Sequence, residues 1–188
     1  MSSFNNSDAK NFKSFIDSHK FFFIAGHKEP DGDCIASCLG IASILDYFQK
    51  PYQLLSAGPF KRADITKFEN KFSSEMEFQT QDERNNTGLI ITDCSELHRL
   101  GDIDGDLKGL DTFIIDHHKT AEIPDNASSF IDSSAPACSY LIQLFYETLI
   151  GPLPLDVAEI IFFGFCTDTG FFKFLDNNSY DVFQAVSR

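Results

Sequence analysis

Residues 21–45 predict the fold class, because they read as a strand, a loop and a helix in succession: FFFIAGHKEPDGDCIASCLGIASIL. Their unbroken apolar run stops at Gly26, as expected for a parallel strand that is covered on both faces. From residue 33 onward, apolar residues recur at three- and four-residue intervals and form the stripe of a helix that ends near FQKP: Ile35, Cys38, Leu39, Ala42 and Leu45.

The rest of the chain repeats this alternation. Nearly continuous apolar runs predict further strands over residues 52–58, 87–93 and 110–118. Helical spacing predicts helices over residues 8–18, 136–149 and 155–166. Strands that alternate with helices predict an α/β fold, an open and mainly parallel β-sheet with helices on both faces.

Four shorter features are predicted from local residue chemistry. Ser133 and Ser134, with Pro136 near the first turn, are expected to introduce the helix over residues 136–149. The remaining segments are residues 61–70 as polar helix or irregular structure, residues 82–88 as a loop, and residues 177–188 as a helix.

The composition predicts one folded domain with an acidic surface. A chain of 188 residues is long enough for one well-buried core. Its 28 Asp and Glu against 15 Lys and Arg give a net charge of −13, which argues against binding of long duplex nucleic acid. That objection weakens if some of the acids hold metal ions.

Cysteine usage and the N-terminal residues predict a cytoplasmic protein. The five cysteines are odd in number and lie mostly in apolar stretches, so we interpret them as small buried hydrophobic residues rather than as disulfides. The first residues are polar, and no apolar run approaches the ~18 residues that span a bilayer, so no membrane contact is expected.

Acids and histidines follow several of the predicted strands at their carboxyl ends. His27, Asp93 and the triplet Asp116, His117 and His118 each follow a separate strand. Open α/β sheets bind ligands at this edge, near the point where the strand order reverses. Asp31 and Asp33 open the first predicted helix beside His27, and Asp168 follows a late apolar helix that can close the site from its side.

Each acid also has a purely structural interpretation. Asp31 and Asp33 suit a turn and a helix N-cap, and taken alone that interpretation is the better one. Asp93 and Asp168 are compatible with loop or turn positions. These interpretations together require several elements to bring carboxylates and imidazoles to one edge by coincidence.

A crevice that gathers four or more carboxylates predicts divalent metal ions. Mutual repulsion would raise the carboxylate pKa values unless cations neutralised them. Mixed carboxylate and imidazole ligands suit Mn²⁺, with Mg²⁺ or Co²⁺ as substitutes. Six ligands are too many for one ion that must also bind substrate, so two ions that share a carboxylate are expected.

Four segments, taken in order, resemble the motifs of the DHH phosphoesterase superfamily: GHKEPDGDCIAS from residue 26, TDCSELHRLG from residue 92, IDHHKT from residue 115 and GFCTDTGFFKF from residue 164. The PDGD form and the TDTGFFKF ending look closest to the bacterial nanoRNA and pAp phosphatase (oligoribonuclease) branch. Cys34 stands where that branch more often has a small residue such as Ala, and we expect it to be tolerated.

The resemblance implies a role for each site residue. One ion would be held by His27, Asp31 and Asp93. The other ion would be held by Asp33, Asp93, His117 and Asp168, with Asp93 as the bridge. His118 would face the substrate phosphate, and Asp116 would orient the neighbouring histidine. His19 and His98 are expected at the surface, and Arg99 is expected to touch the site.

The resemblance also implies the function. We expect a metal-dependent phosphoesterase in which a water activated by two Mn²⁺ ions hydrolyses phosphate esters of nucleotides or short oligonucleotides, such as nanoRNA, pAp and linear or cyclic dinucleotides. The alternatives are a manganese-dependent inorganic pyrophosphatase and a non-catalytic regulatory module. Residues 1–188 are expected to form a single DHH domain without the second, DHHA1 substrate-binding domain, which a homodimer or a partner would supply.

Overall fold

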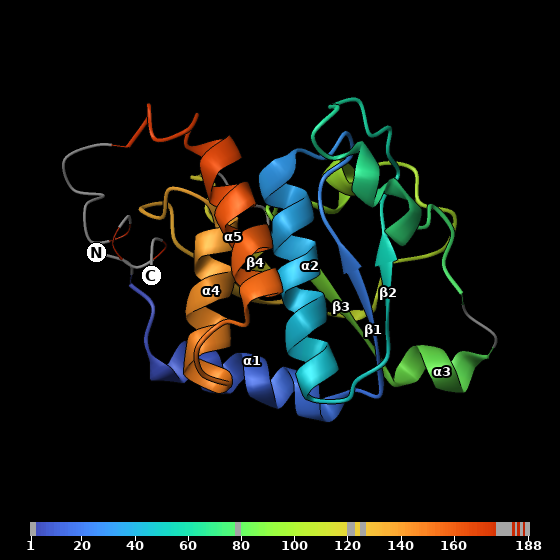
Figure 1. Ribbon diagram of the computed structural model, residues 1–188. Coiled ribbons are helices and arrows are strands. Elements are labelled where there is room, and N and C mark those ends of the chain that lie inside the picture. The colour runs from blue at the N-terminus through green and yellow to red at the C-terminus, as the bar shows by residue number, and fades with distance from the viewer. Residues whose placement is uncertain are drawn as a thin grey trace.

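Five parallel strands form one open sheet in the order β2-β1-β3-β4-β5 (Figure 1). The strands are β1 Phe21–Ala25, β2 Tyr52–Leu55, β3 Thr87–Thr92, β4 Asp111–Asp116 and β5 Ala127–Ile131. This computed structural model describes residues 3–77, 80–119, 123–124 and 127–175, together with positions 182, 184 and 186. The sheet confirms the predicted α/β fold with a parallel sheet.

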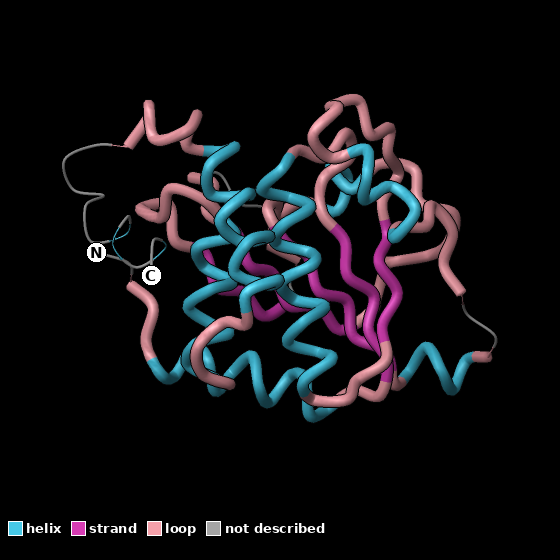
Figure 2. The backbone as a smooth tube through the Cα atoms, in the orientation of Figure 1, coloured by secondary structure: helices cyan, strands magenta, loops and turns pink. Residues whose placement is uncertain are grey.

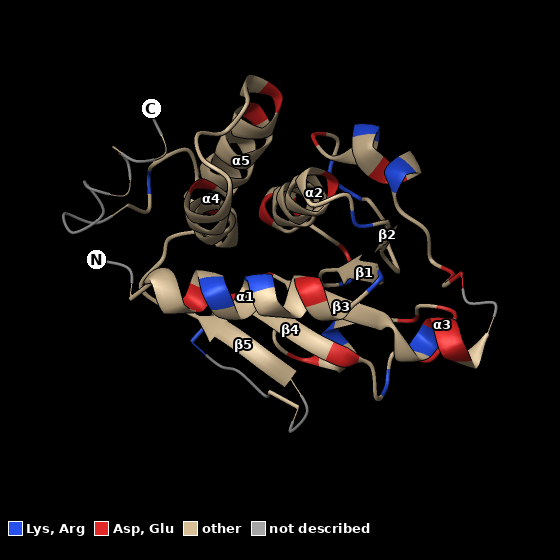
Figure 3. Cartoon of the chain, turned by 90° about the horizontal axis from the view of Figure 1, so that it is seen from below, with Lys and Arg blue, Asp and Glu red and all other residues tan. Residues whose placement is uncertain are grey.

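Four α-helices lie on one face of the sheet: α1 Asn6–Ser18, α2 Gly32–Tyr47, α4 Cys138–Leu149 and α5 Leu155–Asp168 (Figures 2 and 3). Of these, α5 packs mainly against α2 and α4 and forms an outer layer. A Cβ atom added to Gly32 would lie 2.3 Å from Thr167 Oγ1, so the end of α5 that carries Asp168 lies against the first turn of α2.

The opposite face of the described structure is covered mainly by loops and by the 3-10 helix η2 Leu97–Leu100, so the prediction of helices on both faces is met there by η2 alone. Leu100 and Leu110 pack there with Met76 against the strands. Gly101 ends η2 with a φ of 79°, a left-handed conformation that glycine adopts without strain. Gly101 thus ends η2 after four residues.

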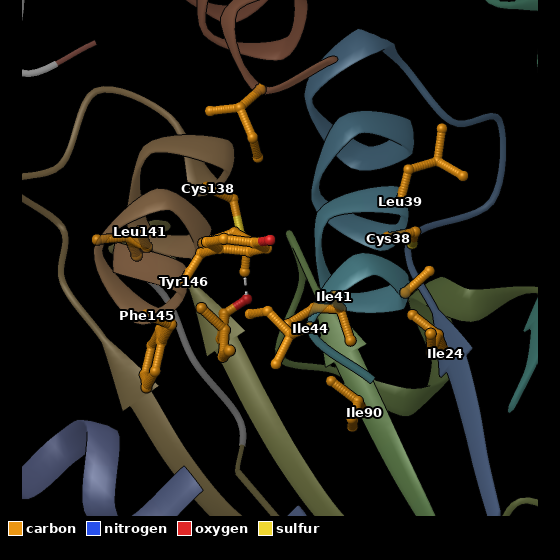
Figure 4. Close-up of a cluster of buried hydrophobic side chains, with 14 of the residues drawn as sticks. Ile24, Cys38, Leu39, Ile41, Ile44, Ile90, Cys138, Leu141, Phe145 and Tyr146 are labelled. Atoms are coloured by element: carbon orange, nitrogen blue, oxygen red, sulfur yellow. Dashed lines mark hydrogen bonds between the residues drawn. The ribbon is translucent and has the colours of Figure 1, made fainter. Parts of the chain in front are cut away.

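Alternating residues of β1 divide the core between the two faces. Phe22 and Ile24 pack toward the helices, whereas Phe23 and Ala25 pack toward the loops. Figure 4 shows the helix-side cluster, to which the strands contribute Ile24 and Ile90, α2 contributes isoleucines and α4 contributes apolar residues. Burial of each such side chain contributes about 1.5–3 kcal/mol, so these contacts fix α2 and α4 on the sheet.

The strand order reverses between β1 and β3. After β1 the chain crosses one face through α2, and after β3 it crosses the other face through η2. The two connections leave the sheet edge in opposite directions and open a crevice at the carboxyl ends of β1 and β3. A ligand site is therefore expected at this point.

Several local predictions differ from the structure. Strand β5 was not predicted, because its sequence ASSFI is polar and half exposed, as suits an edge strand. The region predicted as a loop over residues 82–88 includes most of the short helix α3 Gln81–Asn85, which Thr80 caps. The segment over residues 61–70 contains most of the 3-10 helix η1 Thr66–Lys71. The helix predicted over residues 177–188 lies largely outside the described residues; positions 182, 184 and 186 are helical.

Candidate metal centre

Asp93 lies at the centre of the crevice, directly after β3. Its Oδ2 is 3.5 Å from Nε2 of His27, and its Oδ1 is 3.3 Å from Nε2 of His117. The residue has a φ of 59°, which is uncommon for a residue other than glycine and turns the chain sharply at the strand end. One carboxylate thus faces two imidazoles from two different strand ends.

The environment of Asp93 fits a cation. The residue is only 2% exposed, and its Oδ1 accepts no hydrogen bond from the described residues. A buried carboxylate oxygen without a partner costs free energy unless a positive charge lies next to it. Adjacent ligands of an octahedral ion are separated by about 3 Å, which is close to the 3.3 Å between Asp93 Oδ1 and His117 Nε2. The donor set is therefore suited to a divalent ion.

Both central histidines are oriented by backbone carbonyls. Nδ1 of His27 is 2.9 Å from the carbonyl oxygen of Lys28, and Nδ1 of His117 is 3.2 Å from that of Ala135. A carbonyl only accepts hydrogen bonds, so Nδ1 donates in both residues. The neutral imidazole then presents the Nε2 lone pair toward Asp93, which is the orientation that a metal ligand requires.

Asp33 is fully buried at the amino end of α4. Its Oδ2 accepts a hydrogen bond from the backbone N–H of Cys138 at 2.6 Å, and its Oδ1 accepts one from Ser139 at 2.9 Å. Asp33 therefore caps α4 across the fold, whereas Ser133 and Ser134 do not, so the predicted serine cap is wrong. A carboxylate at a helix amino end is stabilised by the helix dipole.

The His117 imidazole has two further carboxylates beside it. Nε2 of His117 is 3.9 Å from Asp33 Oδ2 and 3.6 Å from Asp168 Oδ2. Asp168 is the last residue of α5, so a helix from the outer layer completes this side of the site. The predicted convergence of Asp33, Asp93, His117 and Asp168 is therefore present in the structure.

Asp31 is the N-cap of α2. Its Oδ1 accepts hydrogen bonds from the backbone N–H groups of Asp33 and Cys34, both at 3.0 Å, and lies 3.9 Å from Nε2 of His27. The structural interpretation of Asp31 as a cap therefore holds, while its carboxylate still borders the crevice.

Among the described residues, three groups of side chains bring atoms that could ligate a metal within 4.8 Å of one another: Asp33, His117 and Asp168; Asp93, His117 and His118; and His27, Cys34 and Asp93. The first two groups contain only residues that the sequence had singled out. The third contains Cys34 in place of Asp31. Sequence reasoning missed Cys34 because buried cysteines are usually packing residues; the signal was its position directly after Asp33.

His118 lies at the more open side of the centre and is held by Asp116. Its Nδ1 is 2.7 Å from Asp116 Oδ1, which also accepts hydrogen bonds from the backbone N–H groups of His117 and His118. The other oxygen, Asp116 Oδ2, accepts a hydrogen bond from Ser95 Oγ at 2.8 Å. Asp116 is fully buried, whereas the His118 side chain is 37% exposed, so Asp116 fixes an imidazole that substrate can reach.

Carboxylates control the ionisation of the central histidines. Burial by itself would lower the pKa of His27, but the nearby carboxylates of Asp31 and Asp93 outweigh it and raise the pKa to about 10. At His117 the neighbouring carboxylates, led by Asp93, likewise outweigh burial and raise the pKa to about 10. Both imidazoles therefore bind a second proton when no metal ion is present.

The pKa values of Asp33 and Asp31 shift in opposite directions. Burial and then the negative charge of Asp93 raise the pKa of Asp33 to about 8. Burial would raise the pKa of Asp31, but the His27 imidazole and the Cys34 backbone N–H outweigh it and lower the pKa to about 2. Ionisation of Asp33 is thus disfavoured by the negative charge of its neighbours. A divalent ion would relieve this repulsion.

The other predicted residues have mixed outcomes. His19 is buried rather than at the surface, because its Nδ1 lies 2.9 Å from the Phe15 carbonyl and its Nε2 lies 3.4 Å from Asp111. The His98 side chain is 75% exposed, as predicted. Arg99 lies beside the site through its backbone, because its carbonyl accepts a hydrogen bond from the Lys28 N–H at 2.7 Å. All five cysteines are buried and unpaired by disulfides, as predicted.

No helix among the described residues is long and apolar enough to cross a bilayer. This finding agrees with the hydropathy of the sequence.

Known proteins resemble this chain in sequence and in fold. A probable manganese-dependent inorganic pyrophosphatase of Archaeoglobus fulgidus is 26% identical over 164 residues, which are 80% of this chain and 50% of that protein. The chain therefore spans about half the length of this relative.

Two solved structures share the fold. An exopolyphosphatase-related protein from Bacteroides fragilis superposes with a TM-score of 0.71 at 20% identity, over 97% of this chain and 56% of that chain. A putative family II inorganic pyrophosphatase from Methanococcus jannaschii gives a TM-score of 0.60 at 24% identity, over 88% of this chain and 53% of that chain.

The family described as "DHH family, N-terminal domain" matches residues 21–165. The match starts with β1 and extends into α5, so it includes His27, Asp93 and the Asp116, His117 and His118 triplet. Because this match covers well over half of the residues, the chain belongs to the DHH family.

Proposed function

We propose that this protein is a hydrolase that acts on phosphate bonds at a centre of two divalent ions, and that Mn²⁺ is the ion used. The observation that carries the proposal is Asp93, a buried carboxylate that lies between His27 and His117 with one oxygen unpaired. The manganese-dependent pyrophosphatase named among the relatives supports the choice of ion. The nitrogen and oxygen donors also suit Mn²⁺ better than a thiolate-selective metal.

Two sets of residues would hold the ions. We assign His27 and Asp31 to the first position, Asp33, His117 and Asp168 to the second, and Asp93 to both. When bound, the ions supply Lewis acidity and a water molecule of lowered pKa for attack on phosphorus. The protein's own contribution is to fix the ligands: backbone carbonyls orient His27 and His117, and the amino end of α4 holds Asp33.

His118 is the residue best placed to interact with the phosphate. The hydrogen bond to Asp116 raises the pKa of His118, so the imidazole is protonated over a wider pH range. Its Nδ1–H donates to Asp116, which leaves Nε2–H free to donate to a phosphoryl oxygen or to a leaving oxygen. Such a donor stabilises the charge that develops in the transition state.

The substrate class that we favour is the phosphate ester of a nucleotide or short oligonucleotide. The PDGD and TDTGFFKF motifs support this choice, because they resemble the nanoRNA and pAp phosphatase branch. The second candidate is inorganic pyrophosphate, which the pyrophosphatase relative favours through its 26% identity over 80% of this chain. Both reactions use the same metal centre and differ in the groups around the phosphate.

Substrate binding is expected to need residues beyond this domain. The chain spans about half the length of its pyrophosphatase relative. Its net charge of −13 offers little attraction for an anionic substrate. We propose that a second domain, a second copy of the chain or a partner supplies the missing contacts.

A substrate panel tests the proposal. The Mn²⁺-loaded protein would be incubated separately with pyrophosphate, adenosine 3′,5′-bisphosphate (pAp) and the dinucleotide pApA, and released phosphate and nucleotide would be measured. We expect hydrolysis of pAp or pApA at a higher kcat/KM than that of pyrophosphate. Preference for pyrophosphate would establish the second candidate. Absence of turnover in a protein that also binds no Mn²⁺ would identify a non-catalytic module.

A further inference from the structure

Cys34 lies within the ligand group of the first metal position. Its sulfur and one ligand atom each from His27 and Asp93 are within 4.8 Å of one another. The Cys34 side chain is only 2% exposed and forms no disulfide. A nitrogen, a sulfur and an oxygen donor, each from a different element or loop, therefore converge on one point.

The sulfur is held in this place by the end of β1. A Cβ atom added to Gly26 would lie 2.2 Å from Cys34 Sγ, so only glycine leaves room for the sulfur there. Sγ also lies 3.9 Å from the backbone carbonyl oxygen of His27. The same turn that positions the His27 imidazole thus positions the thiol.

The carboxylate of Asp93 also faces this point. Asp93 is 98% buried, and its Oδ2 lies 3.5 Å from Nε2 of His27; its Oδ1, which accepts no hydrogen bond from the described residues, faces His117 instead, at 3.3 Å. Asp31, by contrast, uses its Oδ1 to cap α2. The first position therefore has a buried carboxylate oxygen and a nearby thiol, while Asp31, its expected third ligand, is partly engaged in the helix cap.

We propose that Cys34 is a sulfur ligand of the first metal position, and that it makes this position selective for Co²⁺, Zn²⁺ or Fe²⁺ over Mg²⁺. The proposal rests on the two-ion centre of the proposed function. Thiolate donors select softer ions, whereas carboxylate and water donors suit Mg²⁺ and Mn²⁺. When the metal–sulfur bond forms, the thiol proton leaves to solvent and the ion gains a negatively charged ligand.

The two positions would then differ in their chemistry. The second position is surrounded by Asp33, His117 and Asp168, which offer only oxygen and nitrogen donors. It keeps the preference for Mn²⁺, so the loaded protein is expected to hold two different ions when both kinds are supplied. A packing cysteine would have no such effect on metal preference.

Cobalt absorption tests the proposal directly. The full chain, reduced and free of metal, would be titrated with Co²⁺ while the near-ultraviolet spectrum and the bound cobalt are measured. A thiolate bound to Co²⁺ gives an intense charge-transfer absorption that nitrogen and oxygen ligands do not give. We expect this band in the native protein and its loss in both Cys34→Ala and Cys34→Ser.

Cys38→Ala is the matched control. Cys38 lies one turn further along α2, is equally buried, and has its Sγ 3.3 Å from Thr92 Oγ1 rather than within the ligand group. This variant is expected to keep the band. Zn²⁺ affinity should fall at least about 10-fold in the Cys34 variants and stay unchanged in the control.

Three outcomes would contradict the proposal. Bound cobalt without the band in the native protein would exclude sulfur ligation, and no variant is needed for that result. Retention of the band in Cys34→Ser, or its loss in Cys38→Ala, would assign the sulfur elsewhere. The absorption is independent of hydrolysis, so a protein that shows the band but cleaves no phosphate bond would contradict the proposed function and leave the sulfur ligand in place.

Discussion

At the scale of single residues, Asp93 connects the two halves of the centre. It is the only carboxylate among the described residues that lies within 3.5 Å of both His27 Nε2 and His117 Nε2. Its left-handed backbone places it at the strand end with both oxygens turned toward imidazoles. Asp93 is therefore assigned the bridging role because it faces both imidazoles.

Asp93→Asn should abolish metal binding and hydrolysis together. The substitution keeps the shape of the side chain but removes the negative charge that both positions share. Bound Mn²⁺, measured by elemental analysis after dialysis, should fall from two ions per chain to fewer than about one. Asp17→Asn, on the exposed face of α1, is the matched control and should retain both ions. Full metal content in Asp93→Asn would refute the bridging assignment.

His118→Ala should separate metal binding from catalysis. His118 is half exposed and held by Asp116, so its loss removes a donor to the phosphate but leaves the other ligands in place. We expect kcat to fall by a factor of about 100 or more, with Mn²⁺ content nearly unchanged. Loss of an ion in this variant would show that His118, rather than His117, is a metal ligand.

The convergence of the acids and histidines was predictable from the sequence, whereas the positions of Cys34 and His19 were not. Parallel strands place their carboxyl ends at one edge, so residues that follow β1, β3 and β4 had to meet. Cys34 and His19 depend on tertiary contacts instead. Cys34 is positioned by the space beside Gly26, and His19 is buried by Phe15 and Phe22. The sequence shows only that Cys34 follows Asp33, and no local pattern encodes the environment of His19.

At the scale of elements, the site depends on how α5 approaches α2 and α4. A Cβ atom on Gly164 would lie 2.5 Å from the Ala36 Cβ and 2.9 Å from the Ser139 Oγ. The three helices therefore meet at a point where only glycine fits. This contact sets the height of α5 above the sheet and, through it, the position of Asp168 beside His117.

Gly164→Ala should destabilise the fold and weaken the second metal position. The added methyl group forces the helices apart at a cost of about 1–3 kcal/mol, which exceeds the gain of up to about 1 kcal/mol in helix propensity. Urea unfolding should show the net loss, and Mn²⁺ affinity should decrease because Asp168 moves with α5. Glu159→Ala, on the exposed side of α5, should change stability by less than about 0.5 kcal/mol. A Gly164→Ala protein as stable as the native one would contradict this view of the packing.

Elements with strong periodicity were predictable, and elements fixed by distant contacts were not. The helices α2, α4 and α5 and the strands β1, β3 and β4 follow from apolar spacing. Strand β5 is paired only along β4, and its serines leave no apolar pattern to detect. The cap of α4 comes from Asp33, which lies 105 residues from Cys138 along the chain, so no local signal could identify it.

At the scale of the whole molecule, metal and protons compete for one cluster of side chains. The pKa values of His27 and His117 are raised from 6.5 to about 10, and that of Asp33 is raised from 3.8 to about 8. A group whose pKa is higher in the folded state stabilises the fold below its unfolded pKa, and this contribution is lost as pH rises through the folded pKa. His27, His117 and Asp33 therefore all stabilise the fold at low pH and lose this contribution as pH rises. Asp31, with its pKa lowered to about 2, acts in the opposite direction and only under acidic conditions.

The metal-free protein should therefore lose stability as pH rises. Between about pH 6 and about pH 9, its melting temperature should fall by at least about 5 °C. Saturating Mn²⁺ should reduce this fall, because the ions replace the protons and bind more tightly as pH rises. Calorimetry of both forms gives the comparison, and His98→Ala, which removes an exposed histidine, should not alter the slope. A melting temperature of the metal-free protein that stays constant or rises over this range would contradict the assigned ionisation.

The two-ion centre is tested most directly by diffraction from crystals grown with Mn²⁺, with data collected at the manganese absorption edge. We expect two anomalous peaks about 3.5–4 Å apart, with the Asp93 carboxylate between them and His27 and His117 on opposite sides. A single peak, or peaks that do not contact Asp93, would contradict the two-ion centre.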